Sequence, residues 1–397
     1  MRSPFATAAG RFLLLAVGFF ALYALTAQRG LGWGDSGAFQ FRILSPSFVS
    51  TGSLATDHPY YIRLCRAVCS TPFAVNLVSA FFGALAVGGF FLASRRFAFS
   101  VLFGLSHMLW WQSCLAEVQT MNLALTAFET WCLIRLLAGG RGGWLVALAF
   151  LNGLHFGVHN FAILAWPVYV VVALALVRRR GAGSVPALVF AALAWALPAA
   201  VPISEGLIGG GWDWRRMLVG EYGAQALGIW PRDWVVAAFN LALAALTFYV
   251  PAALLWWRRR ESRGKGGEAA DALAPARPAL LALLAVNAVF WLRYFVPDQA
   301  TFALPTAFFA WLLVSSASVG SVRLAALGLH ELLLPVLAML VLRQLPQPAG
   351  RTPHRHRDDA RYFALPWKFD DDSADRAAAE FAGEWDGYPE CSKEGWK

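Results

Sequence analysis

The chain has 397 residues, of which 58% are apolar and only 14% are charged, against roughly 25% charged in a soluble domain. With 18 Trp, 30 Phe and a mean hydropathy of +0.53, this composition excludes an ordinary soluble protein and a disordered chain, and it is typical of several membrane spans. The net charge of +9 does not indicate a nucleic-acid partner, because the basic residues form short clusters between apolar runs.

Apolar runs of about 16 to 24 residues predict an all-α polytopic membrane protein with about eleven transmembrane helices. The first run follows Arg2 and Arg11 and lacks a small-residue cleavage site, so we expect it to stay in the protein as an anchor. The expected spans are residues 11–27, 73–93, 97–112, 120–138, 143–159, 161–177, 185–202, 234–257, 278–296, 301–318 and 322–342. Residues 1–342 would then form one transmembrane domain.

The basic residues between these spans predict the orientation of the chain. If the N-terminus is cytoplasmic, alternate connections carry basic residues, as at Arg95–Arg96, Arg178–Arg180 and Arg258–Arg260, whereas the opposite connections are longer and less basic. Cytoplasmic loops of membrane proteins carry such an excess of Lys and Arg. We therefore expect a protein of the inner or plasma membrane, with a cytoplasmic N-terminus and an extracytoplasmic C-terminal tail.

Three polar segments are expected on the extracytoplasmic side. In residues 28–72, the stretches GWGDSGAFQFRI and TDHPYYIRLCRAV mix aromatic and charged residues at roughly helical spacing, which is typical of helices that lie in the membrane interface. Residues 204–233 combine a glycine cluster with interleaved Trp and Arg. Residues 343–397 form a polar tail that is too short to bury much of a core. Most acidic residues outside the tail fall on or near this side, which is where we expect any chemistry.

Asp35, in the segment WGDSG (33–37), lies just beyond the outer end of the first span. Glycines let the backbone approach a ligand closely, and a carboxylate at the bilayer surface can reach the head of a lipid-linked substrate while it stays hydrated. Asp35 is therefore the candidate catalytic residue. The alternative is a helix cap, in which Asp35 or Ser36 accepts backbone N–H groups of a helix that begins near Gly37.

Further candidates lie at two other places that are expected on the extracytoplasmic side. Asp57 and His58 precede Pro59, a pattern that suits binding of a phosphate or an acceptor but is also common at the start of a helix. Glu117 lies at the short turn between the third and fourth spans, and it must face protein or water because a lipid-facing carboxylate costs several kcal/mol. A substrate site and a structural polar cluster both satisfy that requirement.

The later spans carry candidates for metal or phosphate binding. His155 and His159 are four residues apart, which fits a shared metal, but no HExxH motif accompanies them and helical histidine pairs commonly satisfy buried hydrogen bonds. An arginine at the outer face either binds a phosphate or only extends to the lipid headgroups. The arginines in this position are Arg215, Arg216 and Arg293, and Asp298 follows Arg293 at the outer end of the same span.

The sequence indicates no cofactor, although a divalent metal is left open. Its five cysteines fit neither a disulfide framework nor a CxxC metal site. Four ionisable residues remain inside the predicted spans, and a transporter would rely on them. They are His107, Glu129, His330 and Glu331.

Several motifs, taken in their order along the chain, resemble the protein O-mannosyltransferase-like branch of the membrane glycosyltransferases with the type C fold. They are GDSG after the first span, DHPYY, AVNLVSA, WWQSCLAEVQTMNLAL, GLHFGVHNFAILAWP and RYFVPDQATFALP, and they cover most of residues 10–318. The resemblance implies a catalytic aspartate in the first outer loop, a polyprenyl- or dolichyl-phosphate sugar as donor, and a reaction on the extracytoplasmic side.

Carried over residue by residue, the resemblance makes Asp35 the first-loop acid and matches His58, Glu117, His159 and Asp298 to polar positions of the family's motifs. The family often has a second acid three residues after the first, where this chain has Ala38. The substrate-binding set that we expect is His58, Glu117, His159, Arg215, Arg216, Arg293 and Asp298.

The function expected from this resemblance is transfer of a sugar, such as mannose, from a polyprenyl-phosphate donor to an acceptor hydroxyl, with inversion and with Asp35 as the general base. The expected partners are the lipid bilayer, the lipid-linked donor and a protein or glycan acceptor, and no nucleic acid. Two alternatives from other classes are a polytopic lipid or solute transporter and a non-catalytic membrane assembly protein.

Overall fold

The computed structural model describes residues 7–30, 32, 34–44, 54–209, 211–219, 234–261, 273–294, 299–316, 319, 321–342 and 365–368. Every regular element in these ranges is a helix. Helix ends follow local sequence signals: Thr7 and Thr71 cap α1 and α5 by accepting hydrogen bonds from Gly10 N (3.0 Å) and Ala74 N (3.2 Å). The all-α class predicted from the apolar runs is therefore confirmed.

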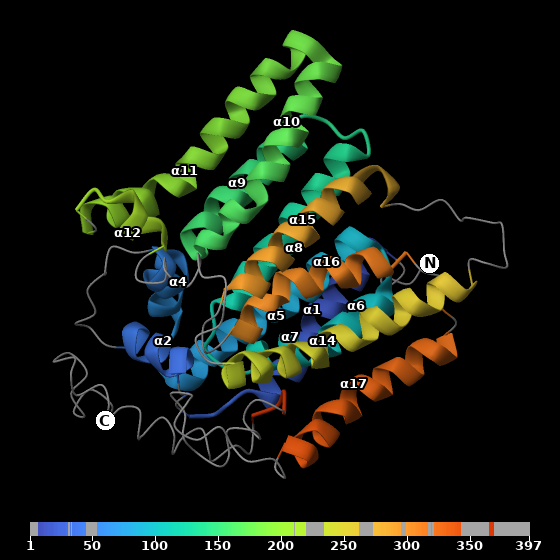
Figure 1. Cartoon of the computed structure of the whole chain (residues 1–397). Helices are drawn as coiled ribbons and strands as arrows, with labels where there is room; N and C mark the ends of the chain where they lie inside the picture. The colour runs from blue at the N-terminus through green and yellow to red at the C-terminus, as the bar shows by residue number, and fades with distance from the viewer. Residues whose placement is uncertain are drawn as a thin grey trace.

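The helices follow one another along the chain and are drawn in Figure 1. They are α1 (Ala8–Thr26), α2 (Gly34–Leu44), α3 (Leu54–Asp57), α4 (Pro59–Val68), α5 (Pro72–Ser94), α6 (Phe97–Leu105), α7 (His107–Ser113), α8 (Gln119–Leu137), α9 (Gly143–Val158), η2 (Asn160–Ala165), α10 (Trp166–Arg180), η3 (Gly181–Ser184), α11 (Val185–Gly209), α12 (Trp214–Val219), α14 (Trp234–Glu261), η5 (Ala274–Ala276), α15 (Arg277–Arg293), η6 (Gln299–Ala303), α16 (Leu304–Val314) and α17 (Ser321–Leu342).

Five helical stretches among the described residues are long and apolar enough to cross a membrane. They are Ala8–Thr26, Pro72–Ser94, Asn160–Arg179, Val185–Gly209 and Ala274–Arg293. Shorter apolar helices occupy Gly143–Val158, Asn240–Leu255 and Gln299–Val314. The total of eleven spans therefore stays a prediction.

The predicted span 97–112 is divided into two helices, α6 and α7. Ser106 between them has an extended backbone, and its hydroxyl donates a hydrogen bond to Phe103 O at 2.6 Å. A serine hydroxyl that bonds to the preceding turn competes with the helical backbone, and this local alternative ends α6. Apolar composition alone did not reveal this break.

Helices α1, α5, α8 and α9 pack against one another around the main apolar core. Gly89 allows α5 to approach α8 closely, because a Cβ atom at this position would lie only 2.8 Å from the Cβ of Ala127. Tyr23 of α1 is fully buried and donates a hydrogen bond to Gly104 O at 2.6 Å, so its hydroxyl is satisfied inside the bundle.

Helices α2, α4 and α12, which come from segments predicted to lie outside the membrane, lie together on the left of Figure 1. Helices α10 and α11 form a long hairpin whose turn points away from them. Residues 28–72 do form helices, namely α2, α3 and α4, and their location in the membrane interface stays a prediction. Leu54 of α3 packs in one apolar cluster with Met217 of α12, which joins the first outer segment to the second.

A short piece of the C-terminal tail, residues 365–368, lies against the end of α1. Lys368 N donates a hydrogen bond to Thr26 O at 2.7 Å, and the Trp367 ring lies 5.6 Å from that of Trp110. The Lys368 ammonium group is buried, donates to Leu365 O at 2.7 Å and lies 5.5 Å from the Trp111 ring. This part of the predicted tail therefore packs at the end of the bundle where α1 leads into α2.

Candidate active site

Asp35 lies in the first turn of α2, and its side chain is exposed. The turn before α2 is tight, because a Cβ atom on Gly37 would lie 2.6 Å from Gly32 O. Gln40, one turn further along α2, accepts a hydrogen bond from Gly32 N at 2.7 Å and donates to Asn76 Oδ1 of α5 at 3.0 Å. These contacts hold the Asp35 turn against the start of α5. Helix α2 begins at Gly34, three residues before the start expected for a cap at Asp35 or Ser36, and a carboxylate in the first helical turn is stabilised by the helix dipole. The catalytic role of Asp35 stays a prediction.

Glu117 is brought next to this turn by the fold. The Ser36 hydroxyl donates to Glu117 Oε1 at 3.3 Å, and Ser79 of α5 accepts from Glu117 N at 2.9 Å. Glu117 is only 8% exposed, so its carboxylate is largely withdrawn from solvent. The segment before α8 therefore places a second carboxylate beside the residue that follows Asp35.

His58 occupies the start of α4 in a left-handed backbone conformation, with φ of 43°. Its Nδ1 lies 3.0 Å from Val158 O, a carbonyl that can only accept, so the proton is on Nδ1. Burial lowers the pKa of His58 from 6.5 to about 4. His58 is therefore a neutral group with Nε2 as its remaining acceptor.

His159 follows the last turn of α9, and its ring lies 4.8 Å from that of His58. Phe161 N donates to His159 Nδ1 at 3.2 Å, and Gln119 of α8 lies 3.4 Å from His159 Nε2. The two histidines predicted to bind substrate are thus side by side, between α4, α8 and the end of α9.

The predicted histidine pair His155 and His159 does not form a shared metal site. His155 is in the last turn of α9 and contacts Glu129 and Asn122, whereas His159 has left the helix with an extended backbone and faces His58. His159 N still donates to His155 O at 2.7 Å, but the extended backbone of His159 places its ring beside His58, while the His155 ring is bonded to α8. Within the part of the chain that the structure describes, no group of three or more His, Cys, Asp and Glu side chains is arranged to hold a metal.

The elements that carry two candidate arginines pack beside His159. Asn160 Nδ2 donates to Leu218 O of α12 at 2.6 Å, and α12 also carries the exposed Arg215. On another side, the Phe161 ring contacts the ring of Tyr294, the neighbour of the exposed Arg293 at the end of α15. Two cationic side chains are therefore placed on elements that border the histidine pair. The Arg216 side chain and Asp298 lie outside the described residues.

Sequence reasoning did not predict the contacts that hold the candidates together. Ser36, Gln40 and Ser79 are buried and each makes one of the hydrogen bonds described above, and buried Gln119 contacts the His159 ring. Ser36 was expected only as a possible helix cap, and Gln119 lies one helical turn from the polar Asn122 in an otherwise apolar stretch. The other contacts join different helices and have no local pattern.

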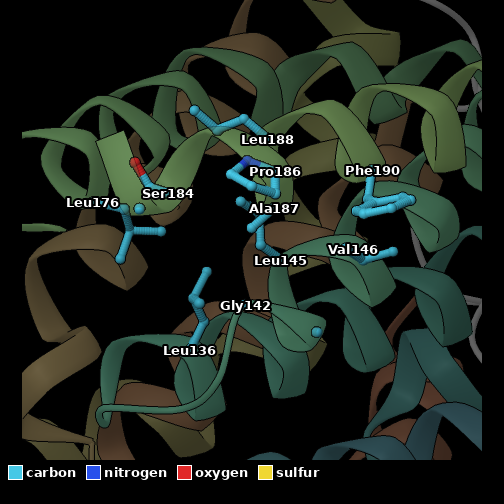
Figure 2. A pocket seen from close by; sticks show the side chains of 12 residues that line it. Leu136, Gly142, Leu145, Val146, Leu176, Ser184, Pro186, Ala187, Leu188 and Phe190 are labelled. Atoms are coloured by element: carbon cyan, nitrogen blue, oxygen red, sulfur yellow. The ribbon is translucent and has the colours of Figure 1, made fainter. Parts of the chain in front are cut away.

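An apolar groove of about 430 Å³ lies at the other end of α8 and α9, between their connection and the α10–α11 turn (Figure 2). Leu136, Leu145 and Phe190 are among its lining residues, and Ser184 contributes one of its few polar side chains. Helix α9 separates it from His159 by 16 residues, which is about 24 Å at 1.5 Å per residue. The groove contains none of the candidate residues.

The fold is similar to that of two solved structures. The crystal structure of ArnT from Cupriavidus metallidurans bound to undecaprenyl phosphate has a TM-score of 0.56 and 14% identity, over 97% of this chain and 73% of that one. The apo structure of the same protein has a TM-score of 0.58 and 14% identity, over 90% of this chain and 69% of that one. The chain therefore has the fold of these two structures, and its long apolar helices are those of an integral membrane protein.

Residues 96–181 match the sequence model of the protein O-mannosyl-transferase TMEM260 N-terminal domain. This stretch runs from α6 to the end of α10 and contains Glu117 and His159. The resemblance to the O-mannosyltransferase-like branch is thereby confirmed for this part of the chain. A search of curated protein sequences gave no match.

Proposed function

We propose that this protein is a membrane glycosyltransferase that moves a sugar, with mannose as the first candidate, from a polyprenyl-phosphate donor to an acceptor hydroxyl. The observation that carries the proposal is the polar site at one end of the bundle, where Asp35, Glu117 and the histidine pair come from three separate segments of the chain. The O-mannosyltransferase match over residues 96–181 and the type C fold support this assignment.

A lipid-linked donor fits the setting of the site. In one of the two similar structures, ArnT is bound to undecaprenyl phosphate, and the apolar helices of this chain would hold a polyprenyl tail in the membrane. The phosphate head would then reach the end of the bundle that carries Asp35. We propose that this end faces the extracytoplasmic side, as the distribution of basic residues predicts.

The proposed reaction is a single displacement at the anomeric carbon. The acceptor oxygen forms a bond to that carbon while the bond from carbon to phosphate oxygen breaks, and the lipid phosphate leaves with the electron pair. Asp35 takes the acceptor proton, which makes it the general base. Attack from the face opposite the phosphate inverts the anomeric centre.

The other site residues have supporting roles in this scheme. Arg293, or Arg215 with Arg216, would stabilise the negative charge on the departing phosphate, because a guanidinium group suits phosphate oxygens. Glu117, His58, His159 and Asp298 would shape the pocket for the sugar and for the acceptor, which we expect to be a protein or a glycan. Since phosphate is already a good leaving group, one base and one cationic clamp suffice, and the scheme calls for no resident cofactor.

Asp35→Asn tests this assignment. Detergent-purified protein would be incubated with labelled polyprenyl-phosphate hexoses and membrane extract, and the labelled product would be identified. Removal of a general base typically costs about 10²- to 10⁴-fold in rate, so we expect transfer to fall by at least about 100-fold with normal expression. Glu205→Gln is the matched control, since Glu205 is an exposed acid that pairs with Arg63 on the same side of the bundle. Full activity of Asp35→Asn would remove Asp35 from the mechanism.

A further inference from the structure

A second polar centre, formed by Glu129 and its neighbours, is buried between α8, α9 and α10, about three helical turns along α8 from Gln119. Glu129 of α8 is 2% exposed, and its Oε1 lies 2.7 Å from His155 Nδ1 of α9. Its other oxygen accepts hydrogen bonds from Asn152 Nδ2 at 3.2 Å and from the Tyr169 hydroxyl of α10 at 2.7 Å. One carboxyl group is thus held by side chains from two other helices.

This centre continues towards the site through an unbroken series of side-chain contacts. His155 Nε2 contacts Asn122 Oδ1, Asn122 Nδ2 donates to Gln119 Oε1 at 3.0 Å, and Gln119 Nε2 lies 3.4 Å from His159 Nε2. Gln119, Asn122 and Glu129 occupy positions i, i+3 and i+10 of α8, which is a single face of the helix. The series therefore runs along α8 from Glu129 to the histidine pair.

Donors and acceptors match from Glu129 to Gln119. At the last contact, Phe161 N donates to His159 Nδ1, so a neutral His159 carries its proton on Nε2, and the Gln119 amino group packs against that N–H group without a hydrogen bond. Because Asn122 uses its amino group towards Gln119, its oxygen faces His155 and requires a proton on His155 Nε2. At the far end, Asn152 Oδ1 accepts from the indole N–H groups of Trp166 and Trp195, at 2.9 and 3.2 Å. If Glu129 is changed, His155 loses the contact that fixes its ring, and Asn122 and then Gln119 can turn in consequence.

Burying an acid and a histidine among apolar helices costs free energy, and apolar residues of similar volume commonly make the folded protein equally or more stable. The pair is therefore not explained by stability alone. We propose that Glu129 and His155 are positioning residues for the active site, which act through Asn122 and Gln119 to fix the ring of His159. This inference rests on the proposed function only for its effect on turnover, since the orientation of His159 can be measured without substrate.

The first test is a double-mutant cycle between Glu129 and Gln119. Glu129→Gln keeps the shape of the side chain but changes its bonds to His155, and Gln119→Ala removes the last link to His159. We expect each single change to lower kcat by about tenfold with little change in the KM for the donor, because misplaced catalytic groups reduce turnover. If Glu129 acts through Gln119, the double variant is no slower than Gln119→Ala. Losses that multiply would overturn the proposal.

Two further variants separate positioning from folding. Asn122→Asp keeps the oxygen that faces His155 but removes the donor to Gln119, so it breaks one link at almost unchanged volume. We expect it to reproduce the loss of kcat. Tyr23→Phe removes a buried tyrosine hydrogen bond, to Gly104 O, that lies outside this series, and it should leave kcat near that of the wild type. An equal loss of kcat in Tyr23→Phe would show a general packing role instead.

The final measurement needs no turnover. In protein labelled with ¹⁵N-histidine, the His159 ring signals, assigned by their loss in a His159 variant, should shift in Glu129→Gln and Asn122→Asp but not in Tyr23→Phe. Unchanged signals in all three variants would overturn the positioning role even in an active enzyme. Shifted signals in a protein that transfers no sugar would support the positioning role and would reject the proposed function.

Discussion

Ser36 donates a hydrogen bond to the Glu117 carboxylate, with 3.3 Å between the two oxygens, although the residues lie on segments far apart in the sequence. Ser36 follows Asp35 in the first turn of α2, and Glu117 precedes α8. This contact is the direct link between the candidate base and the second carboxylate of the site. It also bears on the Ala38 position, where the family that the sequence resembles often has an acid, because here the second acid near Asp35 comes from the segment before α8.

Ser36→Ala tests the importance of that link. The change removes a hydrogen bond to a buried carboxylate, and bonds to charged groups are worth about 1.5–3 kcal/mol. We expect turnover to fall by about tenfold, because Glu117 and the α2 turn would no longer be tied together. Ser184→Ala is the control, since it removes a hydrogen bond to Gly181 O from a buried serine at the opposite end of the bundle. Equal turnover in the two variants would show that the Ser36 contact has no part in the reaction.

The buried His58 predicts a specific dependence of stability on pH. Its pKa is about 4 in the folded protein and near 6.5 when exposed, so the unfolded state binds more protons between these values. The contribution of His58 to stability is therefore complete above pH 6.5 and is lost as the pH falls towards 4, by up to about 3 kcal/mol. The melting temperature in detergent, measured from pH 4 to pH 8, should decline through this window.

His58→Asn should flatten that decline without blocking folding. Asn tolerates a positive φ, and its amide can donate to Val158 O in place of Nδ1, but it does not titrate. His58→Val, which is β-branched at a position with φ of 43°, should destabilise the protein at every pH. A pH profile of His58→Asn identical to that of the wild type would assign the decline to other groups.

Gly157→Ala tests how α9 holds α4, which carries the His58 cap. An added Cβ would collide with the Tyr60 ring and would lie 3.1 Å from Pro202 Cγ. Overpacking of this kind typically costs about 1–3 kcal/mol, so we expect a lower melting temperature and reduced transfer. Gly143→Ala, at the start of the same helix, places its Cβ in open space and should change neither. A stable and fully active Gly157→Ala would mean that Tyr60 moves aside freely.

Glu331→Gln distinguishes the transferase from a transporter that relies on charges within the membrane. Glu331 of α17 is 1% exposed, and neither carboxyl oxygen has a hydrogen-bond partner among the described residues. An unpaired carboxylate in such a place is costly, so a neutral amide of the same shape should be tolerated. We expect unchanged sugar transfer and an equal or higher melting temperature. Loss of a transport flux in Glu331→Gln, with Asp35→Asn unaffected, would favour the transporter.

Much of the architecture was readable from local sequence. Apolar runs predicted helices at most of the expected places, and Thr71 before Pro72 marked the start of α5. The break at Ser106 was missed because the apolar run continues across it, whereas the end of α9 at Val158 lies within one residue of the predicted end at 159. The spacing of His155 and His159 could not show that the His159 ring would turn to the ring of His58, because its extended backbone and its partner on another segment are properties of the tertiary structure.

The amino-acid sequence by itself determined the membrane class, the approximate helices and Asp35 as the leading candidate, because composition, periodicity and glycine-flanked acids are local properties of the chain. Only the tertiary structure decided that Glu117 lies beside Ser36, that the His58 ring contacts the His159 ring and that Glu129 is linked to the site through Asn122. These contacts join residues from different helices, and the packing of the helices, which no short segment encodes, decides which polar groups meet.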